Sequence, residues 1–289
     1  MTARPGPAIG KAGAETMSET IHVCLISDAA YARQLLVAMT SILATAGPED
    51  VLAFHIVDGG LGEETRRSIT RLRRLRPFVC HYLEARPVEM ARFPRHRCAP
   101  CAYYRVLLPR LLPELDKLIY LDCDLIALGS LLDLWRTRLE GKGLAAARDF
   151  TDYVKHNQAT QKHLTGFGFD LRNHYCNSGV MLLNLEKMRR QDFETRFFEA
   201  RSRLDGRIRF SDQDIYNYLF QEDLVLLDQG WNVQAPLGLL PENVFDFSGL
   251  DLRIIHYTTD VKPWDQELNC LFKQEYQAME KVLDTVLAI

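Results

Sequence analysis

The chain has 289 residues, of which 47% are hydrophobic and 25% are charged, with a formal net charge of −3. A chain of this length can bury one sizeable core or two small ones. The slightly acidic balance argues against a nucleic-acid-binding protein, whose affinity depends on a basic surface facing phosphates. Small anions held by a few local cations remain compatible with this composition.

Residues 1–20 differ from the rest of the chain because they are rich in Ala, Gly, Pro and Thr and contain no apolar run. We expect a disordered tail there and no signal peptide. No later stretch reaches the apolar length of a membrane span. The seven cysteines are an odd number in a chain too large to need disulfides, which favours a reducing cytoplasm.

From residue 21 onward, short apolar runs alternate with amphipathic stretches, a pattern typical of α/β layers. The pattern predicts strands over 22–27, 52–57, 79–83, 117–121, 143–147, 175–184, 224–227 and 252–256. It predicts helices over 31–45, 62–75, 103–112, 130–135, 153–165, 185–203, 212–220 and 268–288. No repeat and no linker interrupts residues 21–289, so we expect one compact domain.

The strongest single signal is Asp122-Cys123-Asp124, which ends the apolar strand predicted over 117–121. Burying an ionised carboxylate is costly unless a cation or hydrogen-bond donors satisfy it. Carboxylates at the carboxyl end of a strand in a parallel sheet suit Mg²⁺ or Mn²⁺ carrying a diphosphate. The alternative is a turn with two solvated acids.

Other polar side chains follow predicted strands or loops. Asp28 and Tyr31 come after the first strand, where a nucleotide base stacks in many α/β folds. Arg105 lies near the start of a helix, and Asp149 follows the strand over 143–147. Each has a structural alternative: a helix cap for Asp28, a surface ion pair for Arg105 and a solvated loop acid for Asp149.

Three further segments carry polar groups. Asn177-Ser178-Gly179 interrupts an apolar strand, which allows close approach of a ligand or marks a bulge. A cap at Ser211 explains the acids that open the helix over 212–220, but not Gln213. His256 and Lys262 offer an imidazole for a metal and an ammonium for phosphate, although His256 alone also fits a core histidine.

Together these residues resemble glycosyltransferase family 8, the retaining group that includes bacterial lipopolysaccharide galactosyl- and glucosyltransferases and the glycogenins. The resemblance runs colinearly from residue 21 to about residue 264. Its strongest pieces are 120–124, 177–185, 212–214 and 256–264, the last including Lys262-Pro263-Trp264. It implies a GT-A fold, in which a Rossmann-like mixed sheet flanked by helices joins a nucleotide-binding half to an acceptor-binding half.

The resemblance also implies roles for single residues. Asp122, Asp124 and His256 match the Mn²⁺ ligands, with Mg²⁺ as the other candidate, and the donor diphosphate completes the shell. Lys262 matches a phosphate contact. The remaining matches are uridine contacts at Asp28 and Tyr31, positions around the transferred sugar at Arg105, Asp149, Asn177, Asp212 and Gln213, and other donor-site positions at Cys123 and Thr259. Thr259 replaces a frequent Gly, and Ala30 a frequent Asn.

The implied activity moves galactose or glucose from a UDP-sugar to a saccharide or glycolipid acceptor, in cell-surface polysaccharide or lipopolysaccharide synthesis. Retention allows two routes: a front-face reaction, or a double displacement in which Gln213 forms a transient covalent bond to the sugar. We favour the front-face route, in which Gln213 stabilises the sugar cation. The alternatives are a nucleotide-sugar-binding protein without turnover and a metal-dependent nucleotidyltransferase. The Arg-rich stretch 66–76 predicts either a solvated helix face or contact with anionic lipid at the inner face of the membrane.

Overall fold

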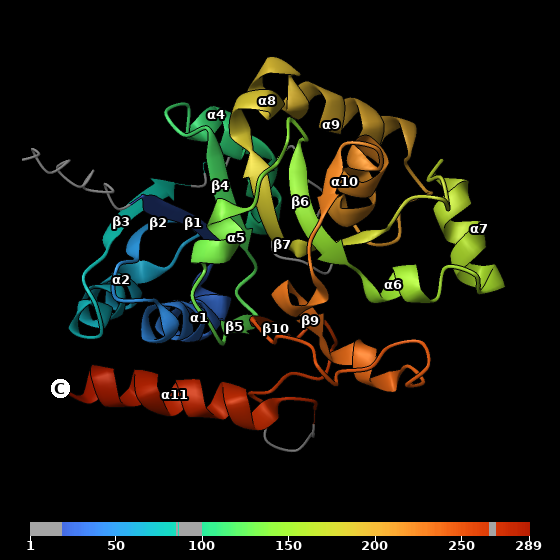
Figure 1. Cartoon of the computed structure of the whole chain (residues 1–289). Helices are drawn as coiled ribbons and strands as arrows, with labels where there is room; N and C mark the ends of the chain where they lie inside the picture. The colour runs from blue at the N-terminus through green and yellow to red at the C-terminus, as the bar shows by residue number, and fades with distance from the viewer. Residues whose placement is uncertain (1–18, 85, 87–99, 266–269) are drawn as a thin grey trace, which may run out of the picture.

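A seven-stranded sheet forms the centre of the molecule (Figure 1). The computed structural model describes residues 19–84, 86, 100–265 and 270–289. In sheet order the strands are β3 (Val79–Glu84), β2 (Val51–Asp58), β1 (Thr20–Ser27), β4 (Lys117–Leu121), β7 (Cys176–Asn184), β6 (Leu144–Arg148) and β8 (Leu224–Leu226). Strand β7 is antiparallel to β4 and β6, and the other pairs are parallel.

Helices cover both faces of this sheet, which explains why β1 and β4 are apolar on both sides. One face packs against α1 (Ala32–Thr45), α2 (Gly62–Arg71), α5 (Leu132–Arg136) and α11 (Lys273–Ala288). The other packs against the 3₁₀ helix η3 (Pro100–Leu107) and helices α4 (Leu108–Leu111), α8 (Leu185–Arg190), α9 (Phe193–Arg203) and α10 (Asp212–Phe220). No helix among the described residues is long and apolar enough to cross a bilayer.

A second, three-stranded sheet brings the end of the chain to the acid pair. Strand β10 (Ile254–His256) lies between β5 (Leu125–Ala127) and β9 (Val233–Gln234) (Figure 1). His256 pairs in antiparallel register with Leu125, the residue that follows Asp124. This pairing carries the imidazole to the carboxyl end of β4, and neither β5 nor β9 was predicted.

The structure confirms the predicted α/β class and most predicted elements, with four corrections. The helix predicted over 185–203 is two helices, because Asp192 between them adopts a left-handed φ of 48°. The stretch 153–165 holds parts of two short helices, α6 (Phe150–Tyr153) and α7 (Gln158–Gly166). The stretch 103–112 is mainly 3₁₀ helix. Helix α11 begins at Lys273, while residues 266–269 and residues 1–18 of the predicted tail lie outside the described residues.

Three histidines occupy adjacent strands of the main sheet. Nδ1 of His22 lies 3.0 Å from Nε2 of His55, and the rings of His55 and His81 stack with centroids 5.1 Å apart. Burial and, to a smaller extent, the neighbouring His22 and His81 together lower the pKa of His55 from 6.5 to about 4. The folded protein therefore holds His55 neutral at pH values where the unfolded chain takes up a proton.

We predict that this histidine makes the fold sensitive to acid. Because the pKa of His55 is lower in the folded state, its effect on stability is absent above about pH 7 and grows as pH falls through 6.5 toward 4. The free energy of unfolding should drop by on the order of 1 kcal/mol between pH 7 and pH 5 from this group. Urea unfolding of His55→Gln should show a smaller drop in the free energy of unfolding between pH 7 and pH 5. Replacement of the exposed His156 should leave the size of this drop as in wild type.

Candidate functional site

The predicted site residues gather at one edge of the main sheet. Strands β1, β4 and β6 end at this edge, and β7 begins there because it runs in the opposite direction. The turn after β4 carries the two acids, and residues 177–179 at the start of β7 face them. Open α/β sheets place ligands at the carboxyl ends of their strands, so this edge is the expected binding position.

The two acids have different partners. Oδ1 of Asp122 accepts a hydrogen bond from the Tyr120 hydroxyl at 2.7 Å. Asp124 presents Oδ1 to Nε2 of His256 at 3.2 Å and Oδ2 to Nζ of Lys262 at 2.7 Å. The same His256 nitrogen lies 3.6 Å from Oδ2 of Asp122. The imidazole therefore faces both carboxylates at once.

These partners shift the carboxyl pKa values in opposite directions. Burial raises the pKa of Asp122, and the charges of Arg105 and His256 only partly oppose that effect. Burial acts in the same sense on Asp124, but hydrogen bonds from His256 and Lys262 hold the pKa of Asp124 well below its usual range. The protein itself thus stabilises Asp124 as an anion, while Asp122 depends more on a nearby cation.

The three side chains fit a divalent cation. One ligand atom from each of Asp122, Asp124 and His256 lies within 4.8 Å of the others. Two carboxylates and one imidazole match the preferences of Mn²⁺ better than those of Zn²⁺, which favours sulfur and nitrogen. Gly179 leaves the space that they occupy: a Cβ there would come within 2.1 Å of Cε1 of His256 and 2.6 Å of Oδ2 of Asp122.

A buried arginine ties the acid pair to helix α10. Arg105 is 7% exposed and donates from Nε and Nη2 to the carboxylate of Asp212, with Nη2 at 2.7 Å from Oδ1. Its Nη1 donates to the Ser178 carbonyl at 2.9 Å and lies 3.3 Å from Oδ1 of Asp122. The guanidinium is therefore a bridge inside the site rather than a surface ion pair.

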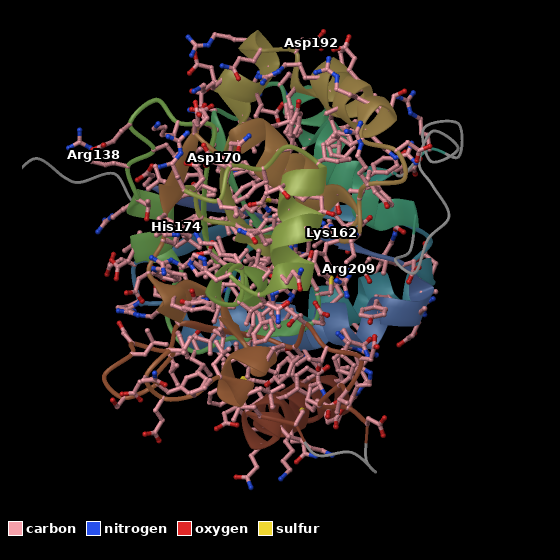
Figure 2. The ribbon with its side chains drawn as sticks, turned by 90° about the vertical axis from the view of Figure 1, so that its right-hand side faces the viewer. Arg138, Lys162, Asp170, His174, Asp192 and Arg209 are labelled. Carbon is pink, nitrogen blue, oxygen red and sulfur yellow. The ribbon has the colours of Figure 1, made fainter. Side chains whose placement is uncertain are left out.

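Gln213 is held at both ends of its amide. Oε1 accepts from the backbone N–H of Ser178 at 3.1 Å, and Nε2 donates to the hydroxyl of Tyr175 at 3.3 Å. Tyr175 in turn donates to the fully buried Asp214 at 2.5 Å. Asp214 also contacts Nε2 of His163 on α7 at 3.2 Å. Figure 2 shows this side of the molecule, with Lys162 of α7 and Arg209 labelled.

A family model described as "Glycosyl transferase family 8" matches residues 22–267, which is most of the chain. The chain belongs to this family. It is 24% identical over 273 residues to General stress protein A of Bacillus subtilis, covering 89% of this chain and 92% of that protein. It is 26% identical over 262 residues to Lipopolysaccharide 1,2-glucosyltransferase of Escherichia coli, covering 87% and 75%.

Solved structures agree with this assignment at the level of the fold. The galactosyltransferase LgtC, solved in complex with donor and acceptor sugar analogs, superposes with a TM-score of 0.80 and 24% identity, covering 91% of this chain and 96% of that one. The glycosyltransferase GlyE of Streptococcus pneumoniae gives a TM-score of 0.68 and 22% identity, covering 93% and 63%. The predicted GT-A fold is thereby confirmed, and the chain is a glycosyltransferase of a retaining family.

Within this family 8 fold, the remaining predicted residues lie around the same edge. Asp28 caps the 3₁₀ helix η1 (Ala29–Tyr31), accepting from the backbone of Ala30 and Tyr31, as its structural alternative predicted. The ring of Tyr31 meets Trp264 edge-on with centroids 6.0 Å apart. Cys123 is buried, with Sγ 3.2 Å from the Ile26 carbonyl, and Thr259 donates to the Val261 carbonyl at 2.8 Å.

The alternative that Asp149 is a solvated loop acid is wrong. It is 8% exposed, caps helix α6 through the N–H of Thr151, and accepts a hydrogen bond from Nδ2 of Asn177 at 2.9 Å.

The prediction of a cap at Ser211 is only half right. Ser211 precedes α10, but its hydroxyl pairs with Tyr103 instead of capping, and its φ of 55° is strained for a residue other than glycine.

Two site residues escaped the sequence analysis. Tyr175 orients Gln213, and Asn232 contacts His256, with Nδ1 of the imidazole 3.1 Å from Oδ1 of the amide. The 3₁₀ helix η4 (Gln229–Trp231) ends just before Asn232. No periodic pattern marks a residue in such an irregular segment, so only the folded structure identifies it.

We predict that Gly179→Ala weakens metal binding. The new methyl group would overlap His256 and Asp122, and both side chains must move away from the shared position. Mn²⁺ affinity, measured by titration of the free-ion EPR signal, should fall at least about tenfold. Gly166→Ala is the matched control because its methyl group would meet no atom within 4 Å. Equal affinity of the two variants would contradict the placement of the metal.

Proposed function

We propose that this glycosyltransferase is a Mn²⁺-dependent hexosyltransferase that moves galactose or glucose from a UDP-sugar to a saccharide or glycolipid acceptor, in cell-surface polysaccharide or lipopolysaccharide synthesis. The observation that carries the proposal is the cluster of Asp122, Asp124 and His256 beside the ammonium of Lys262. Family membership supports sugar transfer. The names of the relatives, a lipopolysaccharide glucosyltransferase and a galactosyltransferase, support a hexose.

Asp122, Asp124 and His256 would hold the cation, which when bound neutralises negative charge on the diphosphate leaving group. Lys262 supplies a second positive charge next to it, since its Nζ already contacts Oδ2 of Asp124. Its side chain is 17% exposed, so it can turn toward a phosphate oxygen. No acid needs to protonate the leaving group, because charge stabilisation alone lowers the barrier.

The sugar would lie between Asp149 with Asn177 on one side and Asp212 with Gln213 on the other. The carboxylates accept hydrogen bonds from sugar hydroxyls, and the amide of Gln213 offers an oxygen to the electron-poor ring. In the front-face route the acceptor hydroxyl attacks from the side that the diphosphate leaves and gives its proton to that leaving group. Asp28 and Tyr31 are proposed to contact the uridine.

The sequence analysis left open two alternative functions and one contact with the membrane. Membership of family 8 excludes the nucleotidyltransferase, whereas a binding protein without turnover must be tested by activity. Within the Arg-rich segment 66–76, Arg66 pairs with Asp58 at 2.6 Å, Arg74 donates to the Val286 carbonyl, and Arg76 to the Ala46 carbonyl. Packing within the chain explains these charges. Contact with anionic lipid and a cytoplasmic location stay predictions.

The deciding experiment offers UDP-galactose, UDP-glucose and UDP-galacturonate with Mn²⁺ and measures slow release of UDP without acceptor. We expect the wild type to hydrolyse one UDP-hexose. The variant Asp124→Asn, which removes a charged ligand at nearly constant size, should hydrolyse none of the three donors. With an acceptor, NMR of the anomeric proton should show an α-linked product. UDP binding without release of any sugar would favour the binding protein, and a β-linked product would contradict retention.

A second prediction concerns Lys262→Ala. The lost contact is to phosphate, so UDP affinity should fall about tenfold or more while uridine affinity changes little. Calorimetry with both ligands measures the difference. Lys187→Ala is a matched control, because that side chain is 15% exposed and pairs with Asp223 at 2.6 Å, outside the site. Equal losses for UDP and uridine would place Lys262 away from the phosphates.

A further inference from the structure

A chain of buried hydrogen bonds connects the proposed metal ligand His256 with Asp149 at the proposed sugar position. Nδ1 of His256 lies 3.1 Å from Oδ1 of Asn232. Nδ2 of Asn232 donates to Oδ1 of Asn177 at 2.9 Å, and Nδ2 of Asn177 donates to Oδ2 of Asp149 at 2.9 Å. The chain therefore passes through two amide side chains, of which Asn232 has no role in the proposed function.

The direction of this chain is fixed from the Asp149 end. A carboxylate only accepts hydrogen bonds, so Asn177 must present its NH₂ group to Asp149 and its oxygen to Asn232. The backbone N–H of Gly179 donates to that same oxygen at 2.9 Å, which fixes the amide orientation independently. Asn232 must then present its NH₂ group to Asn177 and its oxygen to His256. The Nδ1 atom of His256 must therefore carry a proton.

Burial makes this order strict, because bulk water does not cover these side chains. Asn232 is 0% exposed, His256 3% and Asn177 6%. Reversing one amide would place two oxygens against each other inside the protein, at a cost comparable to that of a buried unsatisfied polar group. The backbone of Asn232 is held as well, since its carbonyl accepts from Nε2 of Gln229 at 2.7 Å.

We propose that Asn232 is a positioning residue that keeps a proton on Nδ1 of His256, so that Nε2 is the nitrogen that offers its lone pair to a cation shared with Asp122 and Asp124. This inference rests on the metal site of the proposed function. Histidine ligands of metals depend in this way on the partner of the other ring nitrogen, and loss of such a partner typically lowers metal affinity about 10–100-fold. Through Asn177, the same chain ties the imidazole to the proposed sugar-binding acid.

The test compares two substitutions of similar shape. Asn232→Leu removes the acceptor for Nδ1–H, whereas Asn232→Asp keeps it, and the new carboxyl group in its protonated form also keeps a donor to Oδ1 of Asn177. EPR titration of the free Mn²⁺ signal should show the dissociation constant raised about 10–100-fold in Asn232→Leu and within about threefold of wild type in Asn232→Asp. Asn217→Leu is the structural control, because Asn217 is 4% exposed and bonds to the backbone of Cys176 and Gln213 without touching His256. It should keep wild-type Mn²⁺ affinity.

A second readout reports the position of the proton directly. NMR of ¹⁵N-labelled, metal-free protein at alkaline pH should find the His256 proton on Nδ1 in wild type and Asn232→Asp, with the signal assigned by its loss in His256→Gln. If Asn232→Leu does not fold, this measurement tests the inference by itself. An unprotonated Nδ1 in wild type overturns the inference.

The Mn²⁺ titrations separate two kinds of failure. If wild type binds Mn²⁺ and Asn232→Leu binds it equally well, the inference is wrong and the metal site stands. The same conclusion holds if Asn232→Asp or Asn217→Leu loses as much affinity as Asn232→Leu. If wild type binds no Mn²⁺ at all, the proposed metal site fails and the inference fails with it.

Discussion

The reversed direction of β7 is the constraint on which the site depends. In a sheet whose other pairs are parallel, β7 alone begins at the edge where β4 and β6 end. Its first residues therefore meet both strand ends: Asn177 reaches Asp149 after β6, and Gly179 lies under Asp122 and His256. A side chain at position 179 would occupy the place of the ligands. The topology thus decides where a glycine is required, and the glycine makes room for the side chains of His256 and Asp122.

The charges around Arg105 and Lys262 explain why these two side chains differ in how freely they can move. Buried acids need partners, and Arg105 is committed to Asp212 and Asp122 by a guanidinium that is almost fully buried. Releasing it toward a substrate would leave Asp212 unpaired. Lys262 contacts Asp124 and the Tyr257 carbonyl, and keeps part of its surface in solvent. In the proposed function a diphosphate brings more negative charge, and Lys262 is the side chain that turns to it while the arginine bridge holds the acids in place.

The sequence predicted those parts of the fold whose signals are local. Strand β4 and helix α10 agree with their predicted bounds, because an apolar run ended by acids marks the first and a regular period marks the second. Strands β5 and β9, of three and two residues, are too short to show a period. Asn232 follows a single 3₁₀ turn, and its importance arises from contact with His256, which is 24 residues away in the chain. Such a contact leaves no trace in local sequence, and only the assembled structure reveals it.

The contacts of Gln213 bear on the choice between the two routes to retention. Its carbonyl oxygen accepts the N–H of Ser178, and its amide nitrogen is directed at the Tyr175 hydroxyl, whose own proton goes to the buried Asp214. Both ends of the amide are therefore fixed, so the side chain acts as an oriented dipole. To form a covalent bond to the sugar, Oε1 would have to weaken the hydrogen bond from Ser178, and an amide is already a poor nucleophile. An oriented dipole instead stabilises a developing positive charge without moving, which favours the front-face route.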